Sequence, residues 1–185
     1  MKRYAGFTLI ELMITVAIAA IVLTIGVPSF RDMILNNTRV AQVNEFVGAL
    51  NMARSEAVKT GFRVVICRSS DGVSCATDVS GIWENGWLIF IDRNRNGLLD
   101  SAAPNNEELL KVQSKLPSNF TLRTTTTLTQ WIAYGSNGFN EGNTGLGTGT
   151  FKLCDTRGVD QARFIVINST GRPNVREKNT SDTCP

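Results

Sequence analysis

The side chains best placed to bind a metal ion lie together in residues 92–100. Oxygen-bearing side chains occupy the first, third, fifth and ninth positions of this segment: Asp92, Asn94, Asn96 and Asp100. Calcium takes about six to eight oxygen ligands, often from a loop with glycine at the sixth position, which is Gly97 here. The twelfth position holds Ala103 where a bidentate glutamate belongs, and the two arginines inside the segment would repel a cation. A plain turn is therefore favoured over a calcium site.

Other combinations of residues give no support for catalysis. Histidine is absent from all 185 residues, which excludes histidine-dependent triads and zinc sites that contain histidine. Glu107 and Glu108 could suggest hydrolysis, as could Asp92 and Asp100, but adjacent residues on a strand point to opposite faces. The glycine-rich segment 135–149 lacks the Gly-Lys-Ser/Thr that ends a phosphate-binding loop. We expect no enzymatic activity and no cofactor.

Basic and acidic residues are nearly balanced. The chain has 19 Lys and Arg against 16 Asp and Glu, a formal net charge of +3. This balance gives no global case for nucleic-acid binding, so any basic surface would have to be local. Trp83, Trp87 and Trp131 could stack on bases, but they lie in strand-like apolar runs, and packing in the core is favoured.

The four cysteines all follow the apolar N-terminal segment: Cys67, Cys75, Cys154 and Cys184. They show no C-x-x-C spacing, so a zinc site is not indicated. In an oxidising compartment such as the periplasm they would form disulfides. Three pairings are possible, and Cys67–Cys75 with Cys154–Cys184 is favoured, although the sequence does not fix the connectivity.

One apolar run dominates the first thirty residues. Between Phe7 and Phe30 the only charged residue is Glu11. As a helix this segment would measure roughly 36 Å at about 1.5 Å per residue, enough to cross a hydrocarbon core of about 30 Å. Lys2 and Arg3 precede the run and favour a cytoplasmic N-terminus, with the rest of the chain outside.

A secretory signal peptide is the alternative interpretation of this run. Ala17-Ile18-Ala19 offers a small-x-small cleavage pattern. Against it, the apolar run continues to Val27 and contains the carboxylate of Glu11. A retained membrane-spanning helix is therefore favoured.

Beyond Pro28 the apolar pattern becomes amphipathic. Apolar residues follow three- and four-residue steps: Val43, Phe46, Leu50, Ala53 and Ala57. Charged residues, among them Arg39, occupy the other positions, and Gly61 gives a stop signal. We predict one helix from about Thr8 to Thr60, kinked at Pro28, which spans the membrane over about 7–30 and then packs on a folded domain.

Residues 61–185 are predicted to form that domain, rich in β-strands. Short apolar or β-branched runs lie between turn residues: Phe62–Arg68, Gly86–Asp92, Leu109–Lys115, Phe120–Thr127, Gln130–Tyr134, Thr150–Cys154 and Ala162–Asn168. With almost no helix between them, these strands indicate an antiparallel sheet or two packed sheets, and so an α+β chain. Residues 135–149 hold six glycines and are predicted to be a mobile loop.

The hexapeptide Gly6-Phe7-Thr8-Leu9-Ile10-Glu11 resembles the processing motif of type IV prepilins and type II secretion pseudopilins. In those families a prepilin peptidase cuts after the glycine and methylates the new N-terminal phenylalanine. The resemblance implies that residues 1–6 are a leader peptide, cleaved between Gly6 and Phe7, and that Phe7 is N-methylated. Pro28 matches the helix-kinking proline of many pilins.

Glu11 is expected to take part in assembly. A carboxylate inside an apolar membrane helix costs about 2–3 kcal/mol or more, so it needs a partner. Cleavage would create an α-ammonium group at Phe7 in the same membrane layer. An ion pair between Glu11 of one subunit and the amine of its neighbour would neutralise both charges. A carboxylate that simply lies near the lipid headgroups is the alternative.

The rest of the chain resembles the FimT/FimU/GspH group of minor pilins, through three stretches: Ile66–Gly72 with Cys75, Trp83 with Gly86–Asp92, and Phe151–Asp155 leading to Ile165–Arg172. The resemblance implies the type IV pilin fold, with a long helix on a β-sandwich-like head. It also implies an inner-membrane protein with a periplasmic head that enters the pilus near its tip, where such subunits prime assembly. Other minor and major pilins, the prepilin peptidase and the inner membrane are the expected partners.

Two alternatives follow from the same resemblance. FimT-like pilins of natural transformation bind DNA through a Gly-Arg-x-Arg motif, and Gly171-Arg172-Pro173-Asn174 keeps its first arginine only. Arg172, Arg176 and Lys178 could form a small basic patch, although a solvated tail held by Cys184 is favoured. The other alternative is a GspH-like pseudopilin of type II secretion, which the sequence does not separate from a pilus subunit.

Overall fold

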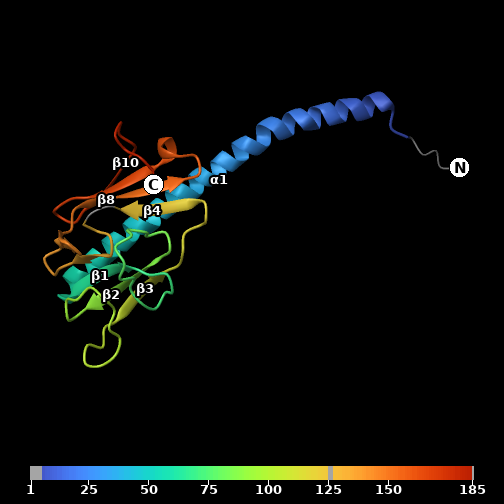
Figure 1. The fold of residues 1–185 in the computed structure, drawn as a ribbon. Helices are drawn as coiled ribbons and strands as arrows, with labels where there is room; N and C mark the ends of the chain where they lie inside the picture. Colours follow the sequence, from blue (N-terminus) through green and yellow to red (C-terminus); the bar gives the residue numbers. More distant parts are fainter. Residues whose placement is uncertain (1–5, 125–126, 185) are drawn as a thin grey trace. The chain divides into compact units, whose positions relative to one another are not determined.

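The structure, a computed structural model, describes residues 6–124 and 127–184. It contains two compact units, one up to Thr38 and one from Arg39 onward. One long helix, α1 (Leu9–Thr60), contributes its first part to the first unit and its second part to the second. Figure 1 shows this helix and the strands of the second unit.

In the described residues of the first unit, most of the helix surface is exposed. All residues from Gly6 to Ile34 are exposed, although most of them are apolar. In the described part of the chain α1 is the one helix long and apolar enough to cross a membrane. It remains helical through Pro28, and a kink there stays a prediction.

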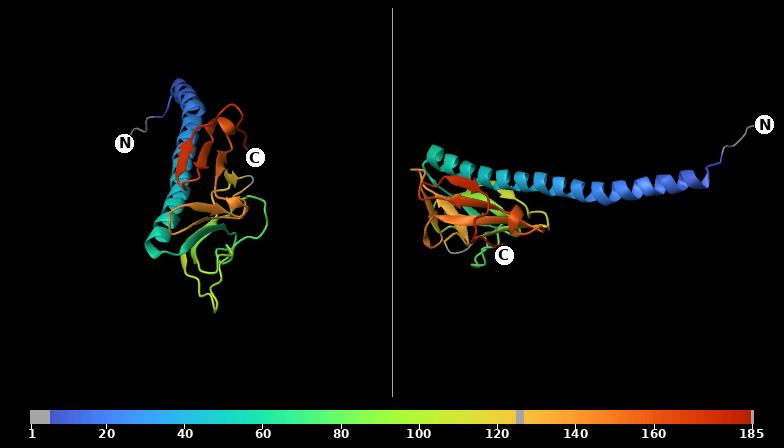
Figure 2. Two further views of the ribbon diagram at one scale, coloured as in Figure 1. Left: turned by 90° about the vertical axis from the view of Figure 1, so that its left-hand side faces the viewer. Right: turned by 90° about the horizontal axis from the view of Figure 1, so that it is seen from above.

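The second unit contains two antiparallel sheets (Figures 1 and 2). The first has the order β3-β2-β1-β5-β6-β7, with β1 Arg63–Arg68, β2 Trp87–Asp92, β3 Leu109–Gln113, β5 Trp131–Tyr134, β6 Asn140–Gly142 and β7 Gly145–Leu146. The second has the order β10-β9-β8-β4, with β4 Phe120–Thr124, β8 Gly149–Asp155, β9 Arg163–Ile167 and β10 Pro173–Arg176. A short 3-10 helix, η1 (Val159–Gln161), connects β8 to β9.

The amphipathic part of α1 buries the face that its apolar spacing predicts. The buried apolar residues are those of the three- and four-residue steps, with one addition: Val43, Phe46, Ala49, Leu50, Ala53 and Ala57. Gly61 ends the helix with a left-handed backbone (φ 74°), and its N–H donates to the carbonyl of Ala57 at 3.0 Å. Glycine adopts this conformation at little cost, which explains the clean stop.

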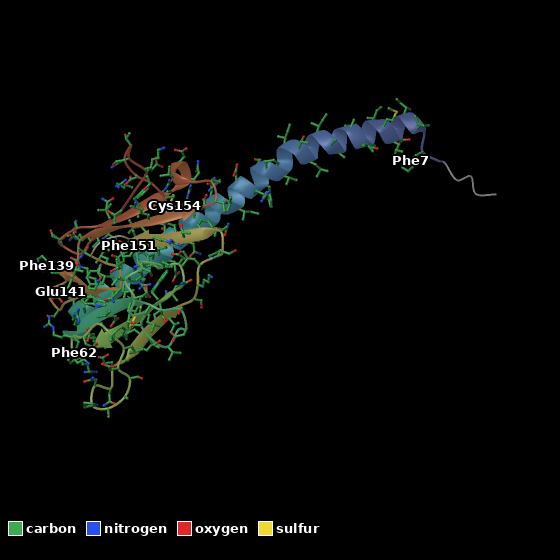
Figure 3. All side chains as sticks on the ribbon, in the orientation of Figure 1. Phe7, Phe62, Phe139, Glu141, Phe151 and Cys154 are labelled. Carbon is green, nitrogen blue, oxygen red and sulfur yellow. A yellow bond between two sulfur atoms is a disulfide. The ribbon has the colours of Figure 1, made fainter. Side chains whose placement is uncertain are left out.

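Phe46 joins the helix to both sheets. Its ring meets Trp87 of β2 and Phe151 of β8 edge-to-face, with centroids 5.1 Å and 4.7 Å away. Trp83, in the segment before β2, completes the cluster at 5.8 Å from Phe46 and 5.1 Å from Phe151. Edge-to-face pairs add to the stabilisation from burial alone, so this cluster is the centre of the core (Figure 3 labels Phe151).

The central strands of the first sheet are covered on both faces. All residues of β1 and β2 are buried, so the side chains that point away from the α1 side must have their own cover. That second face forms a small core of Val65, Cys67, Leu88, Phe90 and Ala133, against which Cys75, Leu99 and Trp131 pack. The disulfide loop and the loop after β2 therefore each contribute a side chain, Cys75 and Leu99, to the cover of this face.

Two segments predicted as a loop and a tail contain short strands. Residues 135–149 are not one mobile loop, because β6 pairs with β5 and then turns into β7. Most of the segment 171–178 is exposed or half-buried and Cys184 is disulfide-bonded, as expected for a solvated tail held by Cys184. Residues 173–176 also form the edge strand β10, however, paired with β9 from Pro173–Ile167 to Arg176–Phe164. The predicted strand over Phe120–Thr127 is seen as β4 up to Thr124, and Thr125 and Thr126 lie outside the described residues.

Candidate assembly and binding sites

The predicted processing site lies directly before the helix. Phe7 is 84% exposed and precedes Thr8, whose backbone and side chain cap α1. The hydroxyl of Thr8 accepts from the N–H of Glu11 at 3.3 Å, and its carbonyl accepts from the N–H of Leu12 at 3.1 Å. Thr8 and Glu11 therefore stand at the positions of a capping box. The sequence pattern Thr-x-x-Glu carried this signal, and the sequence analysis missed it.

Glu11 is exposed on the apolar part of α1. In the monomer its carboxylate faces no cation that could neutralise it within the described residues, since none of the recorded ion pairs includes it. A helix with an exposed apolar surface and one acid is suited to pack beside similar helices. An ion pair between Glu11 and a neighbouring subunit stays a prediction.

Arg39 fixes the start of the second unit. Its side chain was expected on the solvated face of the helix, but it is only 6% exposed. Nη1 of Arg39 donates to the backbone carbonyl of Gln161 at 2.5 Å and to its side-chain oxygen at 3.0 Å. Burial, with the nearby charges of Arg163 and Arg157, lowers the pKa of Arg39. Arg39 therefore holds α1 against the segment that follows β8.

A carboxylate beside this cluster offsets its positive charge. Burial alone would raise the pKa of Asp155, but hydrogen bonds from Arg157, with the charges of Arg157 and Arg39, outweigh burial and lower it. Nη2 of Arg157 lies 2.7 Å from Oδ2 of Asp155. The two residues support the turn between β8 and η1, and no chemistry follows from them.

The cysteines form two disulfides in the pairing that their order favours. Cys67 on β1 is joined to Cys75, and Cys154 on β8 is joined to Cys184 near the end of the described chain. In the first loop, Asp71 accepts hydrogen bonds from the side chain and N–H of Ser74 and from the N–H of Val73, which lower its pKa well below the usual range. The first loop is thus held by covalent and polar contacts, and the second is closed by its disulfide.

The four candidate calcium ligands do not converge on one point. Asp92 is buried and pairs with Arg63, and its carboxylate also accepts from the N–H groups of Arg95 at 2.7 Å and Gly97 at 3.0 Å. The other three candidates contact one another, because Oδ2 of Asp100 accepts from the amides of Asn94 at 2.7 Å and Asn96 at 2.8 Å.

A residue outside the predicted set closes this loop. The buried carboxylate of Glu107 accepts from the N–H of Arg93 at 2.8 Å and from the N–H of Asp100 at 2.9 Å. Glu108 beside it is exposed, so the two adjacent carboxylates do not form a pair. The polar groups of this loop are largely used to hold its own turns together. In the part of the chain that the structure describes, no cluster of three or more Asp, Glu, Cys or His residues could hold a metal ion.

The three candidate DNA-binding cations are not free to act together. Arg176 pairs with Asp182 through two contacts of 2.5 Å and 3.1 Å, and its guanidinium lies 4.7 Å from the ring centroid of Phe164. The hydrogen bonds from Arg176 hold the pKa of Asp182 at about 2, so this carboxylate stays charged at neutral pH. Lys178 pairs with Asp160. Arg172 is exposed and follows the turn before β10.

We expect no DNA shift in a low-salt gel assay with the full-length chain. Two of the three cations are already neutralised by carboxylates, so few phosphate contacts remain, and each one contributes salt-dependent affinity. The Arg172→Ala/Arg176→Ala variant should match the wild type, as should a Lys59→Ala/Lys115→Ala control of equal charge. A wild-type shift that only the first variant abolishes would restore the DNA hypothesis.

The tryptophans pack within the head, as the sequence analysis favoured over stacking on bases. Trp83 and Trp87 are fully buried, which removes them as stacking platforms for bases. Trp131 is half-buried, and the guanidinium of Arg63 lies 4.6 Å from its ring centroid. Its role is to cover the buried ion pair of Arg63 and Asp92.

The chain matches models of known protein families. The family model described as type II transport protein GspH matches residues 42–171, the greater part of the chain. The chain belongs to this family. A second model, the prokaryotic N-terminal methylation motif, matches residues 1–27 of the GspH-family chain. The resemblance to the FimU/GspH group of minor pilins and pseudopilins is thereby confirmed.

Relatives of this GspH-family chain come from Pseudomonas aeruginosa. Two curated fimbrial proteins are 42% identical to it over 65 residues, which is 35% of this chain. The match spans 42% of the length of each relative. Two crystal structures of the type IV minor pilin FimU align with TM-scores of 0.50 and 0.53 at 20% identity, covering 76% and 80% of this chain and 93% of FimU. This likeness confirms the type IV pilin fold, with a long helix on a two-sheet head.

Members of this family are in general structural subunits and not enzymes. The N-terminal methylation motif and the long apolar helix fit a membrane-anchored pilus component that assembles with other pilins. These statements come from the family.

Proposed function

We propose that this chain is a minor pilin that helps to prime assembly of a type IV pilus and lies near its tip. In that place it would support pilus biogenesis and so twitching motility, adhesion or DNA uptake. The observation that carries the proposal is the combination of a methylation motif over 1–27 with a GspH-family head over 42–171. The similarity of its fold to the minor pilin FimU supports the same conclusion.

The proposal includes the maturation of the chain. The precursor would enter the inner membrane with Lys2 and Arg3 in the cytoplasm and the head in the periplasm. Both disulfides lie in the head, as expected for an oxidising compartment. Cleavage after Gly6 and methylation of Phe7 would then release α1 for packing beside other pilin helices. N-terminal sequencing of the membrane-extracted protein should begin at methylated Phe7, and a start at Met1 or Ala20 would contradict this.

Deletion of the gene is expected to reduce surface pili strongly while the amount of major pilin in the membrane stays normal. A primer is needed in small amount to start each filament, so its loss lowers the number of filaments and not the pool of subunits. Counting filaments by electron microscopy, with an immunoblot of sheared and cell-bound pilin, measures both quantities. Complementation with the wild-type chain is the control, and a normal number of pili in the deletion strain would overturn the proposal.

A pseudopilin of type II secretion is the second candidate, because the matching family model is described as a type II transport protein. The same deletion strain separates the two functions. Loss of secreted enzymes from the medium with normal pili would assign the chain to secretion. Loss of pili with normal secretion would assign it to the pilus.

A further inference from the structure

Three exposed apolar side chains lie around the end of α1. Val58 is 55% exposed, Phe62 46% and Phe139 54%. Figure 2 shows the end of α1 beside the segment around residue 140 in both views, and Figure 3 labels Phe62 and Phe139 at this end. A Cβ atom on Gly138 would lie 3.5 Å from Cγ2 of Val58, so the loop that carries Phe139 touches the last turn of the helix. We call Val58, Phe62 and Phe139 the helix-end patch.

Arginines border this patch. The guanidinium of Arg93 lies 4.8 Å from the ring centroid of Phe62. Arg54 lies beside the loop that carries Phe139, because a Cβ atom on Gly138 would lie 3.2 Å from Nε of Arg54. Arg172 follows Gly171, whose backbone is close to the same loop: a Cβ atom on Gly171 would lie 3.0 Å from the carbonyl oxygen of Gly138. Arg54, Arg93 and Arg172 appear in none of the ion pairs among the described residues. These three arginines are therefore open to a partner, whereas Glu141, labelled between Phe139 and Phe62 in Figure 3, is paired with Arg63 and Arg95.

We propose that the helix-end patch binds the head of a neighbouring pilin, through an apolar surface bordered by carboxylates. The proposal rests on the function proposed above, since it needs a filament that brings heads together. Aromatic residues and arginine are the residues most enriched at protein interfaces. The uncompensated arginines select a partner of opposite charge. Exposed apolar residues that stand singly, such as Val79 in the loop after Cys75, carry no such meaning.

The small size of the patch fits a tethered partner. Three apolar side chains cannot bury the roughly 1,200 Å² or more of a stable independent complex. When two α1 helices already lie side by side, the heads meet at a high effective concentration, and a weak contact is enough. In a filament such contacts are heterologous, so the partner surface need not be a second helix-end patch.

Nucleic acid is a poorer occupant of this surface. Base stacking needs an open aromatic face, and one face of Phe62 is already covered by Arg93. Glu141, with a side chain 48% exposed, lies beside Arg63 and Arg95 at 3.4 Å and 3.5 Å. This carboxylate is already paired with the two arginines, so it cancels none of the charge of Arg54, Arg93 and Arg172.

Photo-crosslinking in cells tests the proposal with the full-length chain. The probe p-benzoylphenylalanine replaces Phe139 in one strain, Val79 in a second and Ile14 in a third. Val79 is 69% exposed outside the patch, and Ile14 is 53% exposed on the apolar part of α1. We expect the probe at 139 to join the chain to another pilin, identified by mass spectrometry, and the probe at 79 to give no such product.

The probe at Ile14 separates the two possible failures. Crosslinks to pilins from position 14 but none from 139 would overturn the helix-end patch while the chain still assembles. No pilin crosslink from either position would overturn the proposed function. A nucleic-acid adduct at 139 would also overturn the patch as a protein interface.

Charge reversal tests the chemistry of the partner. With the probe at 139, Arg93→Glu should lower the yield of the pilin crosslink by at least about fivefold, because it places a carboxylate against carboxylates. Arg93→Lys keeps the charge and should retain most of the yield. An unchanged yield with Arg93→Glu would contradict an acidic partner surface, and thermal unfolding of each variant confirms that the head is folded.

Discussion

Replacement of Glu11 by alanine is expected to leave the chain in the membrane and to remove it from filaments. Glu11 is the only charged residue between Phe7 and Phe30, so its loss makes insertion easier. Without it, the α-ammonium group of a neighbouring processed Phe7 would remain unpaired in the membrane. An unpaired charge there costs about 2–3 kcal/mol, which lowers incorporation by roughly 30-fold or more. Immunoblots of sheared filaments and of membranes measure both fractions.

Two further variants separate the ion pair from the helix cap. The hydroxyl of Thr8 accepts from the N–H of Glu11, so Glu11 also stands at the third helical position of a capping box. Glu11→Gln keeps a side chain suited to that position and removes the charge, and it should fail like alanine. Thr8→Ala removes the capping hydroxyl and keeps the charge, and it should assemble. Normal recovery of Glu11→Gln in sheared filaments would show that the cap matters and the charge does not.

The helix and its buried face could be predicted from the sequence because their signals are local. Three- and four-residue spacing identifies the buried face around Phe46 and Leu50, and Gly61 marks the end. The strands with apolar or β-branched runs, such as β1 and β2, were predicted for the same reason. Their burial on both faces and their register were not, since both depend on which distant segments cover the sheet.

The strands that were missed have polar sequences. Asn140–Gly142 and Pro173–Arg176 show no apolar alternation, and each is ordered by a neighbour that is itself a strong strand. Pairing with a formed sheet can override weak local propensity. Six glycines in residues 135–149 therefore indicated turns correctly but hid the two short strands β6 and β7.

Buried charges were the other gap between sequence and structure. Arg39 and Arg63 look like surface residues in the sequence, and both are buried by partners far along the chain, Gln161 and Asp92. Ion pairs also reduce the charge of the predicted basic patch, where Asp182 neutralises Arg176 and Asp160 neutralises Lys178. A charge pattern predicts a binding surface only when the acids that fold onto it are known.

Truncation of Phe46 to alanine is expected to lower the free energy of unfolding of the head by about 3–5 kcal/mol. Phe46 is fully buried and meets Trp87 and Phe151, one from each sheet, so the cavity would open where helix and sheets join. Denaturation of the full-length chain in detergent with guanidinium chloride, monitored by tryptophan fluorescence, measures the loss of unfolding free energy. Phe139→Ala is the matched control, because Phe139 is 54% exposed and should lose less than about 1 kcal/mol. Equal losses for the two variants would mean that helix and sheets do not depend on this cluster for their attachment.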